Sequence, residues 1–381
     1  MNTLLNDLTL TRGSSSSESQ APLPKRIKVA EPVQIDFEEL IDTEKDLSSK
    51  IEEGFGPNKL GLIIVNNVPN FSEYRAALLP LAFKLANLPS DKLRKLILPE
   101  VAYYIGWGHG KKTFQSTDGK YTKGSFFANP TMDNPQIEAW VDGEHKIIEA
   151  RTPWPTEDLP ELESAFKNLG KLMVDTGLLL SAHLDRYVEE RLPGYEKGKI
   201  TKSITNSNLN RGRLLHYYPS SLENTDGEWS GLHNDIGSLT ALTSAMYFDK
   251  DGNPVNMTDP ETGLFILNRN EEELKVNIPK GSIAFQIGEC AQIHSGGLLM
   301  ATPHKVVRGP DLAGTGISRS TFAMFLCPDN QEPMNIPEGV NTSNVLERHY
   351  GKFPELKDRW QKDQTYANFL YTSISTYYHS K

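Results

Sequence analysis

From about residue 200 onward, the sequence breaks into short segments of β character separated by turn residues. The turns lie at Asp226-Gly227, Asp251-Gly252-Asn253, Asn268-Arg269-Asn270 and Pro279-Lys280-Gly281. Short strands at this spacing predict a closed or sandwiched antiparallel structure and argue against a parallel sheet. This β-rich part is therefore the expected core of the fold.

Helical patterns precede and follow the β-rich part. The clearest predicted helix covers residues 159–192, where apolar residues recur at steps of three to five until Pro193-Gly194 ends the pattern. A second helical pattern covers residues 74–98, and a buried strand is expected over residues 60–65. We therefore expect four regions: a disordered tail at 1–33, an N-terminal helical and mixed region at 34–205, a β core at 206–330 and a C-terminal helical extension at 331–381.

Composition excludes several classes of protein. The 381 residues include 40 Lys and Arg against 49 Asp and Glu, a net charge of −9, so we expect no nucleic-acid partner. No apolar run is long enough to span a membrane, the N-terminus lacks the pattern of a secretory signal, and no membrane partner is expected. With two cysteines, Cys290 and Cys327, the chain cannot build a disulfide framework.

These features predict a cytoplasmic protein, and we expect a monomer. The nucleus is a second candidate location because the basic cluster Lys25-Arg26-Ile27-Lys28 lies in the predicted flexible tail, where an import receptor could bind it. A solvated run of charge is the simpler interpretation of the same residues.

Candidate metal ligands lie in the predicted β core. His233 and Asp235 are two residues apart, so on a strand they project from the same face, and His304 lies in a later predicted strand. Two histidines and one carboxylate match the facial triad of a non-haem Fe(II) oxygenase, which leaves three coordination positions open. Zinc accepts the same ligands, so a zinc hydrolase is an alternative.

A second His-x-Asp pair, His183 and Asp185, falls in the predicted long helix. Positions i and i+2 of a helix diverge by about 200°, so we expect these two side chains to be structural.

An arginine follows the second histidine by fifteen residues. Arg319 is flanked by the apolar residues Phe322, Met324 and Phe325, and an arginine inside an apolar barrel requires an anionic partner. The planar guanidinium binds a carboxylate in a bidentate way, and Thr321 on the same strand face can add a hydroxyl. These two residues therefore predict a carboxylate-binding site, which the zinc hydrolase alternative leaves unexplained.

Taken together, these residues resemble the 2-oxoglutarate and Fe(II)-dependent dioxygenases of the isopenicillin N synthase-like (iron/ascorbate oxidoreductase) group, and in particular a poorly characterised fungal-type subgroup. The resemblance spans about residues 35–330 and includes Leu214-Leu215-His216-Tyr217-Tyr218-Pro219, which is similar to the family's Asn-x-Tyr-Pro strand. His216 stands where the family has Asn, Thr321 where it has Ser, and Glu289 where it has Asp.

The resemblance implies a mainly β fold with helices, in which a double-stranded β-helix (jelly-roll) is framed by N-terminal and C-terminal helices. It implies that His233, Asp235 and His304 bind Fe(II), and that Arg319, Thr321 and Tyr218 bind 2-oxoglutarate. It also implies that O₂ and a small organic substrate react with release of succinate and CO₂. Two alternatives stay open: a 2-oxoglutarate-independent oxidase of the same family, and an iron- or 2-oxoglutarate-sensing regulatory protein.

Candidate substrate contacts come from the N-terminal half of the chain. They are Tyr103, Trp107, Phe126, Phe127 and Asn129. The sequence leaves open whether each of them packs in the core or touches a substrate.

Overall fold

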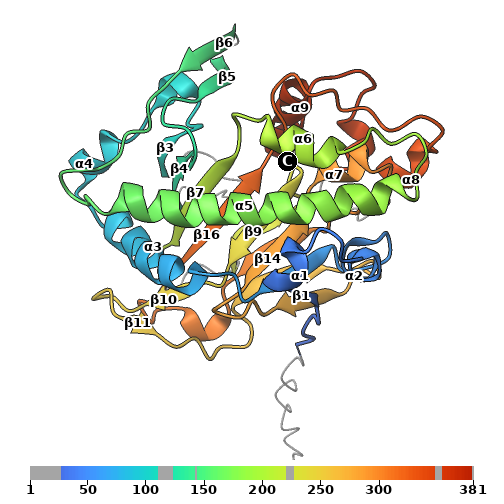
Figure 1. Ribbon diagram of the computed structural model, residues 1–381. Coiled ribbons are helices and arrows are strands. Elements are labelled where there is room, and N and C mark those ends of the chain that lie inside the picture. The colour runs from blue at the N-terminus through green and yellow to red at the C-terminus, as the bar shows by residue number, and fades with distance from the viewer. Residues whose placement is uncertain (1–26, 110–122, 142–143, 220–226, 348–353, 380–381) are drawn as a thin grey trace, which may run out of the picture.

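The computed structural model describes residues 27–109, 123–141, 144–219, 227–347 and 354–379 (Figure 1). Its strands form a ten-stranded sheet, a four-stranded sheet and a separate hairpin. The ten-stranded sheet contains β1 (Val33–Asp36), β2 (Leu62–Asn66), β3 (Gly106–His109), β4 (Lys123–Ala128), β7 (Arg211–Tyr217), β9 (Leu239–Thr243), β10 (Met246–Phe248), β11 (Pro254–Val255), β14 (Ile283–Ile287) and β16 (Ser318–Leu326). The four-stranded sheet contains β8 (Glu228–His233), β12 (Gly263–Leu267), β13 (Glu273–Val276) and β15 (His304–Val307). The hairpin is β5 (Gln136–Val141) with β6 (Glu144–Glu149).

The two larger sheets form the predicted double-stranded β-helix. Their main-path orders are β1-β2-β14-β9-β16-β7-β4-β3 and β13-β12-β15-β8. Every pairing among these strands is antiparallel except that of β1 with β2, so the expectation from the turn spacing is confirmed. Strands from the region 34–205 join the large sheet, so the β core is not confined to residues 206–330. The four-region division itself stays a prediction.

Helices surround the barrel, several of them against the outer face of the large sheet. They are α1 (Phe37–Ile41), α2 (Ser48–Phe55), α3 (Phe71–Ala86), α4 (Ser90–Arg94), α5 (Leu162–Glu189), α6 (Lys199–Thr205), α7 (Glu289–His294), α8 (Thr342–Leu346) and α9 (Tyr366–His379). Figure 1 shows the long helix α5 crossing in front of this sheet, with α3 beside it. The predicted helix at 159–192 is therefore present as α5, and the pattern at 74–98 splits into α3 and α4 because Pro89 ends the first helical segment. Among the described residues, no helix is long and apolar enough to cross a membrane.

Two apolar layers follow from strand alternation. The larger layer packs α3 and α5 against the outer face of the large sheet, through side chains such as Phe166, Phe285 and Phe322. The smaller layer fills the space between the two sheets and includes Tyr217 and Trp229. The space between the two sheets is the barrel interior, where a ligand held between the sheets would lie.

Part of the predicted tail belongs to the barrel. Residues 1–26 lie outside the described residues, but Val29 forms an isolated bridge to Lys275 of β13. The Ala30 amide donates to the Lys275 carbonyl at 2.8 Å, and Lys28 forms an ion pair with Glu272. The segment from residue 28 onward is therefore held against the edge of the small sheet.

Candidate active site

Two histidines face each other across neighbouring strands of the small sheet. His233 at the end of β8 is the register partner of His304 at the start of β15, and their ring centroids lie 4.4 Å apart. The Asp235 carboxylate lies 3.9 Å from His233 Nε2 through Oδ1 and 3.8 Å from His304 Nε2 through Oδ2. One ligand atom from each of the three residues lies within 4.8 Å of the others. The structure thus brings the three predicted ligands to one point.

The chemistry of this donor set fits a divalent metal ion. The Nδ1 atom of His233 lies 2.7 Å from the Gly231 carbonyl and that of His304 lies 3.4 Å from the Thr302 carbonyl, which leaves both Nε2 atoms facing Asp235. Burial, followed by the charge of His304, lowers the pKa of His233 and favours the neutral imidazole that binds a metal. Asp235 Oδ2 is buried without a hydrogen-bond partner among the described residues, and a metal ion would satisfy it.

A buried ion pair supports the loop that carries Asp235. The Arg359 guanidinium contacts both oxygens of Glu289, at 2.7 and 2.6 Å, and both side chains are fully buried. Glu289 also accepts from Asn234 Nδ2 at 3.2 Å, and its backbone amide donates to the Asp235 carbonyl at 2.8 Å. Tyr377 of α9 accepts from the Asn234 amide at 3.4 Å. Through Arg359 and Tyr377, the C-terminal segment therefore supports the loop that carries Asp235, which we call the ligand loop.

Arg319 lies on β16 with its side chain between the two sheets. Its register partner on β7 is Tyr217, and the guanidinium Cζ lies 5.0 Å from the Tyr217 ring centroid. The Tyr217 ring in turn lies 5.4 Å from that of Trp229 on β8, the strand that carries His233. Arg319 is 6% exposed, and its Nε and Nη1 atoms are buried without a hydrogen-bond partner in the described part of the chain. Unpaired donors on a buried cation favour an anionic partner.

Thr321 shares the inner strand face with Arg319, as expected. Its hydroxyl, however, donates to the Thr243 carbonyl at 3.2 Å and lies 3.3 Å from the Thr243 hydroxyl. The Thr321 proton is thus already used inside the sheet, so Arg319 carries most of the predicted interaction with a carboxylate.

Tyr218 is placed differently from our expectation. Its hydroxyl donates to the Ala86 carbonyl at the end of α3 at 3.2 Å, and its ring meets the edge of His216. The physical reason is strand geometry, because Tyr217 takes the inner position and the following residue turns toward the helices. The tyrosine beside Arg319 is therefore Tyr217, and the role of Tyr218 as a co-substrate contact stays a prediction.

His216 also faces the helices rather than the barrel interior. Its Nδ1 lies 3.0 Å from Ser320 Oγ, and its ring lies edge-on to Phe83 with centroids 5.6 Å apart. Burial lowers the pKa of His216 to about 4, so its ring is neutral at pH 7. The departure from the family's Asn at this position therefore has no direct effect on the co-substrate site.

Only some of the candidate substrate contacts face the barrel interior. Trp107 and Phe126 are register partners, are 2% and 0% exposed, and belong to the core beneath the helices. Asn129 closes a loop by accepting from the Thr131 amide at 2.9 Å. Phe127 lies on the inner face of β4, where the Arg213 guanidinium lies 5.0 Å from its ring centroid. Of these four side chains, Phe127 is the one that lies on the inner face of the sheet.

Sequence reasoning missed a buried lysine inside the barrel. Lys123 opens β4, is 4% exposed and is the register partner of Tyr217, so it lies on the inner face. Its Nζ donates to Ser230 Oγ at 3.1 Å and lies 5.9 Å from the Tyr217 ring centroid. Burial, followed by the charge of Arg213, lowers the pKa of Lys123 well below its usual value. No motif surrounds this residue, so the strand register was needed to find it.

The second His-x-Asp pair is structural, as predicted. His183 Nε2 lies 2.9 Å from the Leu40 carbonyl, which ties α5 to α1. The Asp185 carboxylate accepts from the backbone amides of Ile200 and Thr201, both at 2.9 Å, and so caps the first turn of α6.

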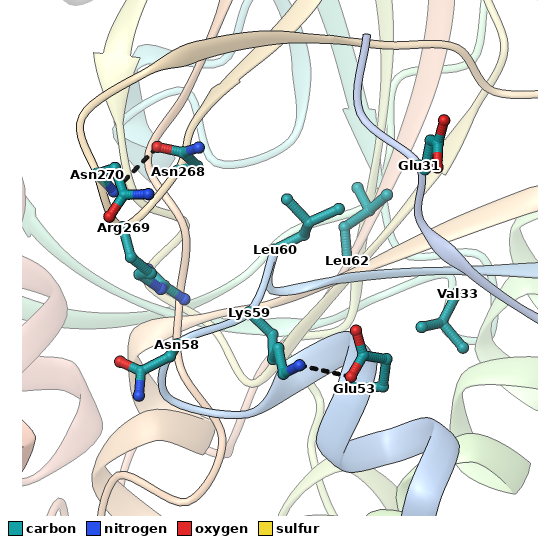
Figure 2. A pocket seen from close by; sticks show the side chains of 10 residues that line it. All are labelled: Glu31, Val33, Glu53, Asn58, Lys59, Leu60, Leu62, Asn268, Arg269 and Asn270. Atoms are coloured by element: carbon teal, nitrogen blue, oxygen red, sulfur yellow. Dashed lines mark hydrogen bonds and ion pairs between the residues drawn. The ribbon is translucent and has the colours of Figure 1, made fainter.

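A cavity of 440 Å³ lies at the edge of the barrel (Figure 2). Figure 2 shows Lys59 paired with Glu53 on one side of it and the turn that follows β12 on the other. Its lining residues are Glu31, Val33, Glu53, Asn58, Lys59, Leu60, Leu62, Asn268, Arg269 and Asn270. The lining shares no residue with the metal triad, and we assign it no part in the active site.

Comparison with known proteins supports the fold. The sequence matches no protein-family model, and the search of curated proteins finds no match. The structure is similar to that of a full-length Neurospora crassa protein in complex with alpha-KG, with a TM-score of 0.59 and 18% identity over 90% of this chain and 95% of that chain. It is also similar to a 2OG-Fe(II) oxygenase family protein from Caulobacter crescentus, with a TM-score of 0.60 and 17% identity over 90% of this chain and 98% of that chain. A third similar structure is the dioxygenase for auxin oxidation (DAO) in rice, with a TM-score of 0.54 and 18% identity over 91% of this chain and 96% of that chain.

These similarities establish the class of fold. The chain has the double-stranded β-helix fold of the 2-oxoglutarate and Fe(II) oxygenases. Its His-Asp-His cluster lies on and beside the small sheet of that fold.

Proposed function

We propose that this protein is an Fe(II)- and 2-oxoglutarate-dependent dioxygenase that oxidises, and by default hydroxylates, a small organic molecule. One observation carries the proposal: the buried Asp235 carboxylate lies within 4 Å of the Nε2 atoms of both His233 and His304, and its Oδ2 has no hydrogen-bond partner among the described residues. The Arg319 guanidinium in the same barrel interior, whose Nε and Nη1 atoms have no hydrogen-bond partner among the described residues, would supply the anion site that a dicarboxylate co-substrate requires.

Each group then has a defined task. His233, Asp235 and His304 would hold Fe(II) and leave three positions open, and the Arg319 guanidinium would bind the far carboxylate of 2-oxoglutarate. Fe(II) and 2-oxoglutarate, when bound, supply the oxidising power: O₂ and 2-oxoglutarate are consumed, succinate and CO₂ are released, and the substrate gains one oxygen atom. The apolar side chains between the sheets would exclude water and thereby limit oxidation of the protein itself.

The size of the substrate is proposed from the neighbours. Structures of the Neurospora crassa protein hold thymine or 5-formyluracil, and a structure of JOX2 holds JA together with 2OG and Fe. Compounds of this size fit the proposal of a small organic substrate for the present chain.

Oxygen-dependent formation of succinate tests the proposal. Protein supplied with Fe(II), 2-oxoglutarate, ascorbate and O₂ should convert 2-oxoglutarate to succinate and CO₂ in equal amounts, slowly without substrate and faster when a substrate is added. His304→Ala should abolish this turnover, whereas the matched variant His183→Ala, which alters a packing histidine, should retain it. Iron binding without any succinate formation would refute the proposal and favour a 2-oxoglutarate-independent oxidase or a sensor.

We further propose a cytoplasmic monomer with access to the nucleus, which the sequence supports through its composition and its basic cluster. Lys28 of that cluster is paired with Glu272, so an import receptor would have to displace this contact. Microscopy of fluorescently tagged full-length protein, compared with Lys25→Ala/Arg26→Ala, tests the location, and light scattering tests the oligomeric state.

A further inference from the structure

Lys123 is a buried cation for which the described residues provide no counterion. Its described polar partner is the Ser230 hydroxyl at 3.1 Å, and the described charge that lowers its pKa is the positive charge of Arg213. Fully buried lysines are rare unless an acidic group pairs with them, because the ammonium loses its hydration. Within the described part of the chain, the position is therefore open to an anionic ligand.

The proposed co-substrate does not provide that anion. The charges of a divalent metal, Asp235, Arg319 and dianionic 2-oxoglutarate cancel, so the positive charge of Lys123 is left over. Lys123 on β4 and Arg319 on β16 are both register partners of Tyr217 on β7, so two strand spacings, about 10 Å, separate their backbones. A carboxylate bound to Arg319 is therefore displaced sideways from the Lys123 position, across the Tyr217 ring.

The surroundings of Lys123 belong to the substrate side of the barrel. Its Nζ reaches Ser230 on β8, the strand that carries His233, so an anion held there lies within the same interior as the metal site. The inner face of β4 continues with Ser125 and Phe127, which provide a hydroxyl and an aromatic ring further along the same strand, beside Arg213. One ammonium and one hydroxyl match a monoanionic carboxylate better than a phosphate dianion, which usually receives more donors.

We propose that Lys123 and Ser230 form a second anion site, which binds a carboxylate of the primary substrate, so that the substrate is a small organic acid. This inference rests on the proposed dioxygenase function and narrows its substrate class. It also explains why β4 places a lysine in an apolar interior, where an apolar residue would be more stable.

Paired acids and amides test the substrate class. Wild-type protein loaded anaerobically with Fe(II) and 2-oxoglutarate is titrated with small aromatic and aliphatic carboxylic acids, such as phenylacetate, and with the corresponding primary amides. Perturbation of the visible absorption of the iron complex reports binding. We expect binding only among the acids, at least ten-fold tighter than their amides. A panel in which no acid is preferred over its amide overturns the inference, whether or not a neutral compound binds.

Variants assign the preference to the two residues. Lys123→Met should reduce the acid-over-amide preference to less than two-fold, Ser230→Ala should reduce it by a smaller factor, and the exposed control Lys171→Met should leave it unchanged. The dissociation constant of 2-oxoglutarate should change by less than two-fold in Lys123→Met. A ten-fold weaker affinity for 2-oxoglutarate in that variant would instead place Lys123 in the co-substrate site and overturn the inference.

Stability separates binding from a structural role. Because Met removes an unpaired buried charge without shortening the side chain greatly, Lys123→Met without ligand should withstand urea at least as well as wild type. A clear loss of stability would show that Lys123 has a structural partner and would overturn the inference. Absence of the iron and 2-oxoglutarate absorption in wild type would instead refute the proposed function, so the two failures are distinguishable.

Discussion

The buried pair of Arg359 and Glu289 offers a sharp test of how the C-terminal segment supports the ligand loop. Arg359→Met removes two contacts to Glu289, at 2.7 and 2.6 Å, and one to Ser373 at 2.8 Å. The Glu289 carboxylate is fully buried and would keep one side-chain partner, Asn234 Nδ2 at 3.2 Å. Removing one member of a buried ion pair costs about 3–5 kcal/mol because the remaining charge is uncompensated.

Urea unfolding of the variants measures this effect. The expected loss for Arg359→Met is about 3–5 kcal/mol in the free energy of unfolding. The control Lys171→Met breaks an ion pair with Asp175 whose side chains are 63% and 53% exposed, so it should lose only about 0.3–0.5 kcal/mol. The double variant Arg359→Met/Glu289→Met should be less destabilised than the sum of the two single variants, because no unpaired charge remains. An Arg359→Met variant no less stable than the Lys171 control would refute the reasoning.

Four further predictions concern packing, capping and buried polar groups. Gly177→Ala in α5 should lose about 1–3 kcal/mol in unfolding free energy, because the new methyl carbon would lie 2.6 Å from Leu326 Cδ2 in a full core. Asp185→Asn should lower the melting temperature by weakening the cap of α6 while iron affinity, measured by titration, stays unchanged. Tyr218→Phe should lower the free energy of unfolding by about 1 kcal/mol, because one hydrogen bond is lost, and should leave the dissociation constant of 2-oxoglutarate unchanged. Burial lowers the pKa of His216 to about 4, so on acidification the unfolded chain binds a proton at this residue before the folded chain does. The free energy of unfolding should therefore fall as the pH decreases from about 6.5 to 4. In His216→Phe, the melting temperature should depend less on pH over this range.

The sequence predicted an antiparallel β core and the long helix because their signals are local, whereas the double-stranded β-helix was implied by the family resemblance. The alternation within short segments after residue 200 and the helical periodicity of 159–192 both depend on neighbouring residues, and both appear in the structure. The contribution of β2 and β4 to the same sheet depends on pairing between distant segments. No local pattern encodes that pairing, so the sequence could not show that the N-terminal region completes the core.

The same distinction holds for the candidate site. His233 and Asp235 were identifiable because a spacing of two is a local property, although β8 ends at His233 and Asp235 lies in the loop that follows. The orientation of Tyr218 was not evident because the choice between adjacent tyrosines depends on which strand face meets the barrel interior, and a shift of one residue reverses the face. Lys123 was missed for a related reason, since its inner position is set by the register of β4 against β7.

Anaerobic titration of Fe(II) into the protein with 2-oxoglutarate tests the central claim most directly. A keto acid chelated to protein-bound Fe(II) gives a weak visible absorption band, and we predict that this band forms in wild type and is lost in His233→Ala. Arg319→Met should still bind iron, but its affinity for 2-oxoglutarate should be at least ten-fold weaker, a change of about 1.4 kcal/mol or more in the binding free energy. A wild-type protein that binds iron without forming the band, or an Arg319→Met variant with unchanged affinity for 2-oxoglutarate, would contradict the account.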